Sequence, residues 1–215
     1  MKRFDSTRPE FSPYGFTCER WTPAGMSRPD RHNEIEVNLL RTGSLTYLFG
    51  GHRTTIEAGK LAVFWAGIPH QIVAFDGEEP YFVVTWPLSE FLAAGLELNV
   101  VNRILHGELL METATDNCDQ PKFEQWEREL RASDPARERA ARLEVQARLL
   151  RFARGISNQP TVRYPAVNLS RADRLACYIA QNYQEPLTSR SIAAANGLHP
   201  NYAMNLFRQA FGTTM

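Results

Sequence analysis

Residues 34–86 alternate short apolar segments with turn signals, a pattern that is typical of antiparallel β-structure. Pairs such as Gly50-Gly51 and Asp76-Gly77 separate segments that are rich in β-branched and aromatic residues. Turn signals at intervals of about 8–12 residues predict an antiparallel sandwich or barrel rather than a parallel α/β sheet. The expected strands are 34–40, 44–49, 52–57, 60–66, 70–75 and 81–86.

From residue 121 onward the apolar residues recur at helical spacing. An apolar stripe predicts a helix over 121–132, and Asp134-Pro135 supplies the N-cap and the first residue of another helix over 135–155. Such a pair of helices packs on its parent barrel or pairs with a second subunit, and the pattern leaves both interpretations open.

Residues 156–169 contain two prolines and no apolar period, which predicts an interdomain linker. A short turn at Gly197 then separates two helices with the spacing of a helix-turn-helix. The expected helices are 170–183, 189–196 and 200–211. The predicted organisation is a ligand-binding barrel over 1–120, a helical pair over 121–155, the linker over 156–169 and a helix-turn-helix segment over 170–215.

Charge supports this division into unlike parts. The 215 residues carry 24 basic and 24 acidic side chains, but residues 1–154 hold 19 and 22, net −3, whereas residues 155–215 hold five and two, net +3. Opposite charges in the two parts predict different partners. An apolar fraction of 43% excludes a disordered chain, and no apolar run is long enough for a membrane span. The three cysteines are far apart and odd in number, which predicts that the protein resides in the reducing cytoplasm.

One predicted strand has a polar face. His32, Glu34, Glu36 and Asn38 share this face by the two-residue period of a strand, and residues 35, 37 and 39 form an apolar face. The polar face either lies in water or lines a barrel interior that receives a small polar ligand.

Two short motifs resemble those of the cupin barrel. Gly59 followed by Trp65-Ala-Gly67-Ile-Pro69-His70 is similar to the second cupin motif, and Asp30-x-His32 with Glu36 is similar to the first. The resemblance implies fold class α+β: a cupin-like antiparallel β-barrel (double-stranded β-helix) with a helical pair, followed by an all-α segment. Two positions depart from the motifs, since Asp30 replaces the first histidine and Trp65 replaces the first proline of the bend.

The cupin resemblance also bears on ligands. In metal-dependent cupins the residues that match Asp30, His32, Glu36 and His70 bind one divalent ion, but with Asp30 in place of a histidine we expect no metal and no cofactor here. A sugar or another polyol is expected instead, because it needs aromatic faces and a few fixed polar groups. The aromatic candidates are equally compatible with core positions, and strand parity prevents all of them from lining one pocket. The candidate ligand-binding residues are His32, Glu36, Tyr47, Trp65, His70, Tyr81 and Trp86.

The string LTSRSIAAANGLHPNYAMNLFRQAFGTT closely resembles the first helix-turn-helix of AraC/XylS-family transcription regulators. In that family the second helix of this motif enters the major groove, which implies that Asn201, Met204 and Asn205 face base edges. Arg190, Tyr202 and Arg208 would contact the DNA backbone. Plain solvent exposure of the two asparagines is the alternative.

The family resemblance implies a cytoplasmic, ligand-responsive, sequence-specific activator of sugar utilisation genes. Its implied partners are double-stranded operator or promoter DNA, a small sugar effector, a second copy in a homodimer, and RNA polymerase, with no membrane. The strings FWAGIPHQ (64–71), HNEIEVN (32–38) and NYAMNLF (201–207) are most similar to a sugar-operon regulator whose effector is an α-galactoside. Family members carry a second helix-turn-helix, so we expect this chain, ending at Met215, to hold a truncated DNA-binding domain.

Two other functions compete with this interpretation. One is a metal-dependent cupin enzyme with a helical tail, although the sequence offers no nucleophile triad, no phosphate loop and no closed metal set. The other is a fragment that does not bind DNA and acts by dimerisation through 121–154. We expect a regulator and not an enzyme, with no catalytic residues.

Overall fold

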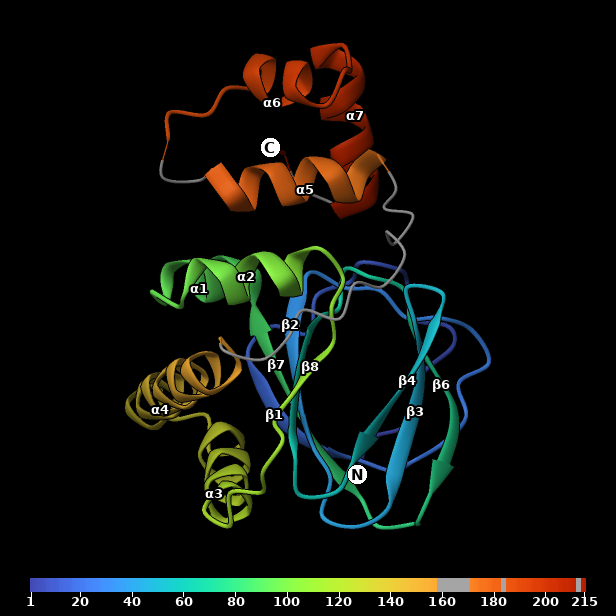
Figure 1. The fold of residues 1–215 in the computed structure, drawn as a ribbon, viewed down its shortest axis with the longest axis vertical. Helices are drawn as coiled ribbons and strands as arrows, with labels where there is room; N and C mark the ends of the chain where they lie inside the picture. The colour runs from blue at the N-terminus through green and yellow to red at the C-terminus, as the bar shows by residue number, and fades with distance from the viewer. Residues whose placement is uncertain (158–170, 183–184, 212–213) are drawn as a thin grey trace.

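The computed structural model describes residues 1–157, 171–182, 185–211 and 214–215 (Figure 1). Two antiparallel sheets occupy the N-terminal part, and helices form the C-terminal part. The predicted α+β fold class with a cupin-like barrel is confirmed. Residues 158–169 of the predicted linker (156–169), together with residue 170, lie outside the described residues, and the boundaries of the predicted domains stay predictions.

The larger sheet has the order β1-β7-β2-β5-β8, and the smaller one has the order β4-β3-β6. All six strands expected over residues 34–86 are present, with ends that differ by at most one residue from expectation. The strands are β1 (Thr17–Trp21), β2 (Glu34–Leu39), β3 (Ser44–Phe49), β4 (His52–Glu57), β5 (Leu61–Trp65), β6 (His70–Asp76), β7 (Tyr81–Pro87) and β8 (Leu110–Met111).

Both faces of β2 are buried, which explains its mixed polar and apolar pattern. Glu36 pairs with Phe64 of β5, whose ring contacts Tyr47 of the opposite sheet, so this face looks into the barrel. Ile35 pairs with Trp65 and with Trp86 on the outer face, which the helices cover. The polar face of β2 therefore lies inside the barrel and not in water.

A tight turn connects β2 of the larger sheet to β3 of the smaller sheet. Gly43 has a positive φ of 71°, and a Cβ atom at this position would lie 1.9 Å from the carbonyl oxygen of Asp76. Only glycine fits both conditions. The turn thus holds the start of β3 against the end of β6.

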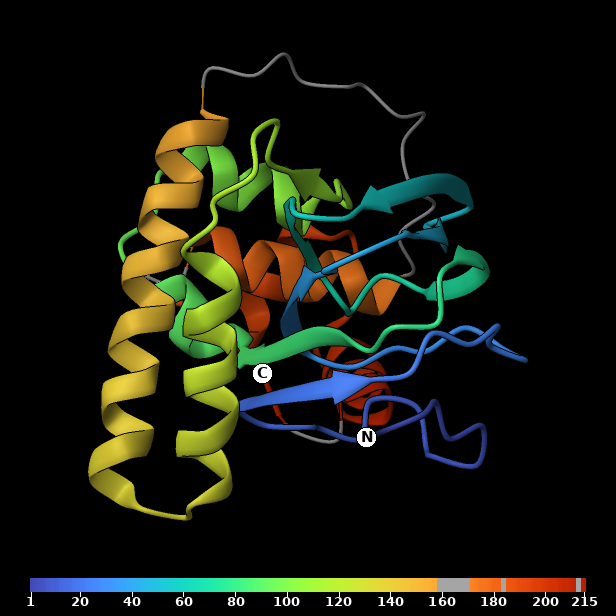
Figure 2. The ribbon, with the colours of Figure 1, turned by 90° about the horizontal axis from the view of Figure 1, so that it is seen from below.

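The helical pair forms an antiparallel hairpin beside the barrel (Figure 2). The helices are α3 (Asp119–Arg131) and α4 (Pro135–Ile156), and the side chain of Asp134 caps α4 by accepting a hydrogen bond of 2.9 Å from the Ala136 amide. Phe123 and Trp126 of α3 are buried, and α3 contacts β1. The helical pair therefore packs on the barrel, which is one of the two interpretations that the sequence left open.

The C-terminal helices are α5 (Arg171–Asn182), α6 (Ser189–Ala195) and α7 (Pro200–Phe211). A capping box between Thr188 and Ser191 starts α6, and Gly197 turns the chain with a φ of 66°. Ile192 and Ala203 are buried between the helices. The expected helix-turn-helix is present.

Four elements were not expected from the sequence: β1, β8, α1 (Leu88–Ala93) and α2 (Leu98–Leu105). Helices this short form only when packing supports them, and neither α1 nor α2 has a side-chain N-cap. In Figure 1 they lie between the barrel and α5, and the thiol of Cys177 on α5 donates to the Leu105 carbonyl at 3.1 Å. Across the described ranges, every helix is too short or too polar to cross a bilayer.

A buried ion cluster joins the hairpin to the barrel. Arg148 of α4 donates to both carboxylate oxygens of Asp119 at 2.6 Å and to Glu112 at 2.6 Å. Arg148 and Asp119 are 4% and 1% exposed, so these charges depend on their ionic partners in the interior.

Replacing Arg148→Ala should lower the free energy of unfolding by about 3–5 kcal/mol, because it removes both close hydrogen bonds of the buried Asp119 carboxylate and leaves it only the more distant Lys122 at 3.9 Å. Urea denaturation measures this change. Arg41→Ala, which removes an exposed arginine 4.0 Å from Glu79, is the control and should stay within about 0.5 kcal/mol of wild type. Equal effects of the two substitutions would contradict the assignment.

Candidate functional site

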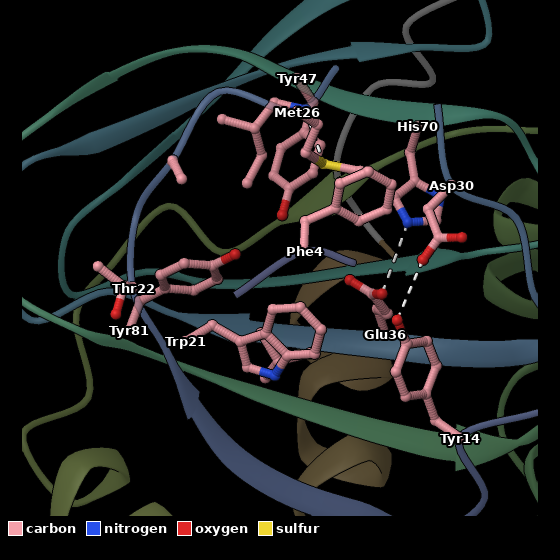
Figure 3. A pocket seen from close by; sticks show the side chains of 13 residues that line it. Phe4, Tyr14, Trp21, Thr22, Met26, Asp30, Glu36, Tyr47, His70 and Tyr81 are labelled. Atoms are coloured by element: carbon pink, nitrogen blue, oxygen red, sulfur yellow. Dashed lines mark hydrogen bonds and ion pairs between the residues drawn. The ribbon is translucent and has the colours of Figure 1, made fainter. Parts of the chain in front are cut away.

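A small cavity lies between the two sheets (Figure 3); the centre of a water-sized sphere can occupy about 30 Å³ of it, within about 440 Å³ of non-atom space that includes open solvent. Its walls combine polar side chains of the barrel with aromatic side chains of the N-terminal segment. The lining residues are Phe4, Tyr14, Trp21, Thr22, Ala24, Met26, Asp30, Glu36, Tyr47, His70, Ile72, Tyr81 and Val83.

Glu36 is the centre of the polar wall. Its Oε1 atom lies 2.8 Å from Nε2 of His32 and 3.6 Å from Nε2 of His70, and its Oε2 atom accepts from Asn38 at 3.3 Å. His32 is fully buried behind Glu36, and its Nδ1 atom lies 2.8 Å from Glu34. The histidine therefore stands between two carboxylates.

This arrangement fixes the charge of His32. Burial alone would lower its pKa, but the hydrogen bonds to Glu34 and Glu36 outweigh burial and raise the pKa of His32 to about 9. Burial likewise opposes ionisation of Glu36, yet the contacts with His32 and His70 hold the pKa of that carboxyl well below its usual range. At neutral pH the cluster contains an imidazolium and an ionised Glu36 carboxylate.

Asp30 and Tyr14 extend the polar wall toward the N-terminal segment. The Tyr14 hydroxyl donates to Oδ2 of Asp30 at 3.2 Å, and the Arg8 guanidinium lies 3.5 Å from the centre of the Tyr14 ring. Burial, followed by the Asp30 charge, raises the pKa of Tyr14. Backbone hydrogen bonds between Asp30 and His70 attach this wall to β6.

Tyr47 and Tyr81 bring hydroxyl groups to the opposite side of the cavity (Figure 3). Burial raises the pKa of both phenols, so both remain neutral. The ring of Trp21 and the ring of Phe4 supply apolar surface between these hydroxyls and the carboxylates. The cavity thus presents hydrogen-bonding groups at its ends and aromatic faces in between.

Of the residues predicted to bind ligand, Glu36, Tyr47, His70 and Tyr81 line this cavity, and His32 lies directly behind Glu36. Phe4 and Trp21 of the N-terminal segment were missed in the sequence, because residues 1–30 show no regular period. Their signal was aromatic content alone, four aromatic residues before Trp21 and Trp21 itself.

Trp65 and Trp86 require a correction, since both lie on the outer face of the larger sheet. The Trp86 ring packs edge-on against Phe91 and donates to Glu90 at 3.1 Å, and the Trp65 ring covers Gly67. Because side chains alternate along a strand, Trp86 lies on the other face of β7 from Tyr81, and Trp65 lies on the other face of β5 from Phe64. They are core residues, and Trp21 and Phe4 supply the aromatic surface instead.

The structure also brings together the residues that the cupin resemblance offered as possible metal ligands. Ligand atoms of Asp30, His32 and His70 lie within 4.8 Å of one another, with Glu36 adjacent. A histidine that ligates a metal must offer a nitrogen lone pair, but both ring nitrogens of His32 face carboxylates at 2.8 Å. As arranged, His32 has no free ring nitrogen to offer a metal ion, because each nitrogen is already engaged by a carboxylate.

The predicted DNA-contacting residues form one exposed surface. Asn201, Met204, Asn205 and Arg208 follow the helical repeat along α7, and Met204 is 37% exposed. Tyr202 lies next to this row and is 47% exposed. Arg190 on α6 is exposed as well. Nδ1 of His199 accepts from the Asn201 amide at 3.3 Å, so His199 caps α7.

The raised pKa of His32 predicts a specific pH dependence of stability. The group stabilises the fold in full below about pH 6.5 and loses this effect as the pH rises through about 9, a change of up to about 3 kcal/mol. Urea unfolding of wild type should therefore show a fall in stability between pH 7 and 10 that His32→Gln lacks. His106→Gln, at an exposed histidine, should keep the fall, and an identical pH profile for all three proteins would refute the assignment.

No protein-family model matches the chain. The chain is 27% identical over 193 residues to the melibiose operon regulatory protein of Escherichia coli K12, a match that covers 86% of this chain and 64% of that protein. The protein of the same name from Escherichia coli O6:H1 gives the same values. The chain therefore spans less than two thirds of the length of these relatives.

Among solved structures, the chain is similar to the AraC-like transcriptional activator CuxR, with a TM-score of 0.49 and 13% identity over 84% of this chain and 63% of that chain. It is also similar to apo ToxT K231A from Vibrio cholerae strain SCE256, with a TM-score of 0.44 and 10% identity over 96% and 97%. The resemblance to AraC/XylS-family transcription regulators, and to the melibiose operon regulatory protein in particular, is confirmed by the similarity in sequence to that protein.

Proposed function

We propose that the chain is the effector-binding part and the first DNA-reading motif of a transcription regulator of sugar utilisation genes. One observation supports this most strongly: a barrel cavity with carboxylates, hydroxyls and aromatic faces is joined in one chain to a helix-turn-helix with an exposed polar row on α7. The similarity to the melibiose operon regulatory protein agrees with both halves.

The effector is a neutral sugar, and an α-galactoside is the first candidate. Glu36 and Asp30 are acceptors for sugar hydroxyls, and Trp21 offers an apolar ring for a sugar face. Carboxylates in a buried wall repel anions, so phosphorylated sugars and sugar acids are excluded as effectors. The name of the melibiose operon regulatory protein points to melibiose, which is uncharged.

The DNA ligand is read in the major groove by α7. An asparagine side chain at Asn201 or Asn205 binds adenine through two hydrogen bonds, and the Met204 side chain contacts a thymine methyl group. Arg190, Tyr202 and Arg208 hold the phosphate backbone and set the register. A net charge of +3 over residues 155–215 gives this segment modest affinity by itself.

A homodimer raises that affinity by placing two reading helices on one DNA molecule. Leu143 and Leu150 of α4 are 59% and 40% exposed and lie seven residues apart, on one side of the helix. This apolar stripe is the surface that a second copy covers. RNA polymerase is the further partner that transcription activation requires.

The effector prediction uses melibiose as the probe. Melibiose at about 100 times its dissociation constant should stabilise the wild-type chain by about 2.7 kcal/mol, seen as a higher melting temperature. Tyr81→Phe removes one cavity hydroxyl and should weaken binding by up to about tenfold. Tyr202→Phe, the same change on the exposed face of α7, should leave binding unchanged. No thermal shift with melibiose, raffinose, galactose or arabinose would rule out the sugar assignment.

The DNA prediction separates base contacts from backbone contacts. On a duplex enriched from a random library by the wild-type chain, Asn201→Ala and Asn205→Ala should each weaken binding by about 1–3 kcal/mol, with little effect on a scrambled duplex. Arg208→Ala should weaken both duplexes and reduce the salt dependence by about one charge. Fluorescence anisotropy measures these affinities, with Asn117→Ala on an exposed barrel loop as control. Equal losses on both duplexes for the asparagine variants would contradict base reading.

A further inference from the structure

A line of buried polar contacts runs from the cavity to the surface on which the C-terminal helices pack. It begins at Glu36 in the cavity wall, passes through the 2.8 Å contact to His32 and continues through the 2.8 Å contact from His32 to Glu34. Glu34 then accepts a hydrogen bond of 2.9 Å from the Gly15 amide. Glu36, His32 and Glu34 are 8%, 0% and 3% exposed.

Glu34 also forms part of a second cavity, which lies between the barrel and the C-terminal helices. Gly15 and Glu34 form its barrel side, Leu88 and Leu92 belong to α1, and Ile179 of α5 and Phe207 of α7 close it from the C-terminal side. One carboxylate therefore contacts the histidine behind the effector cavity and faces the helices that carry the DNA-reading row.

We infer that His32 and Glu34 are positioning residues that connect the state of the effector cavity with the docking of α5 and α7 on the barrel. The inference rests on the proposed function for its biological meaning, since it assigns the route by which an effector would change DNA reading. The connection itself is a property of the chain and exists with or without ligand.

Electrostatics gives the connection its strength. A single imidazolium is shared between two buried carboxylates, and water does not screen charges at such positions. When a sugar hydroxyl donates to Glu36, that carboxylate shares its charge with the ligand and binds His32 less strongly. His32 then binds Glu34 more strongly, and Glu34 is drawn away from the Gly15 amide and from the wall that faces Ile179 and Phe207.

A purely structural role would not have this directionality. A buried ion pair is weak support for stability by itself, because apolar side chains of similar size often serve as well. Glu34 and Glu36 lie two residues apart on β2, and His32 lies two residues before Glu34 in the segment that enters the strand, so the backbone of β2 couples the two carboxylates that hold the histidine. The polar face of β2 thereby joins two cavities that lie at its two sides.

The test is hydrogen exchange of the full chain without ligand or DNA, read by mass spectrometry in α5, in α7 and in the central strands β2 and β7. Glu36→Gln weakens the attraction at the cavity end, and Glu34→Gln weakens it at the docking end. Each should change exchange in α5 and α7 by about 5- to 150-fold, with little change in the central strands. Tyr47→Phe alters the same cavity without touching the line and should leave exchange in α5 and α7 unchanged.

A double variant makes the result decisive. Once Glu34→Gln has cut the line, adding Glu36→Gln should produce no further change in α5 and α7, whereas two independent structural defects would add. Additive effects, a uniform rise of exchange throughout the molecule, or no response of α5 and α7 to Glu36→Gln would each overturn the inference.

Melibiose distinguishes this inference from the proposed function. In wild type it should shift exchange at the same amides, and in Glu34→Gln it should still raise the melting temperature without that shift. Retention of the shift in Glu34→Gln would overturn the inference. If melibiose binds neither protein while the variants behave as expected, the connection stands and the sugar assignment falls.

Discussion

The fully buried imidazolium of His32 is the interaction on which the rest of the site depends. Two carboxylates, Glu34 and Glu36, lie at 2.8 Å from its two ring nitrogens. Removing His32 takes away the cation that the two buried carboxylates share, and removing either carboxylate leaves the imidazolium with a single partner, so each loss is costly in the interior. The cluster also shapes the cavity wall, because Glu36, which lines the cavity, is held by His32 and His70 behind and beside it.

The fold makes this cluster possible by burying both faces of β2. The inner face meets the smaller sheet across the cavity, and the outer face meets Trp65, Trp86 and the helices. A strand with water on one side would leave its acids solvated and its histidine free to titrate normally. Here a polar face is enclosed, so its members satisfy one another, and each becomes sensitive to a ligand that offers a new hydrogen-bond partner.

The sequence predicted what local patterns determine and missed what depends on distant contacts. Strands between Gly-containing turns, the capped helix at Pro135 and the helix-turn-helix at Gly197 all follow from short-range signals, and all are present. The short helices α1 and α2 have no such local signals. They depend instead on packing against the barrel and α5. The two-residue period of a strand showed that not all of the candidate aromatic residues could line the cavity. Only the register of β2, β5 and β7 showed that Trp65 and Trp86 are the ones that face outward. Phe4 and Trp21 reach the cavity from a segment without any period.

The distribution of charge fits the two different ligands proposed for this chain. The barrel and its helices carry a net charge of −3, and their cavity wall is carboxylate-rich, which disfavours DNA and anionic metabolites alike. The C-terminal segment carries +3 with its polar row turned outward on α7. A neutral effector can enter the first part without disturbing the attraction of the second part for phosphate. In the proposed function, an uncharged effector would therefore have to act through geometry, by moving α5 and α7 relative to the barrel, and not through a change in the total charge.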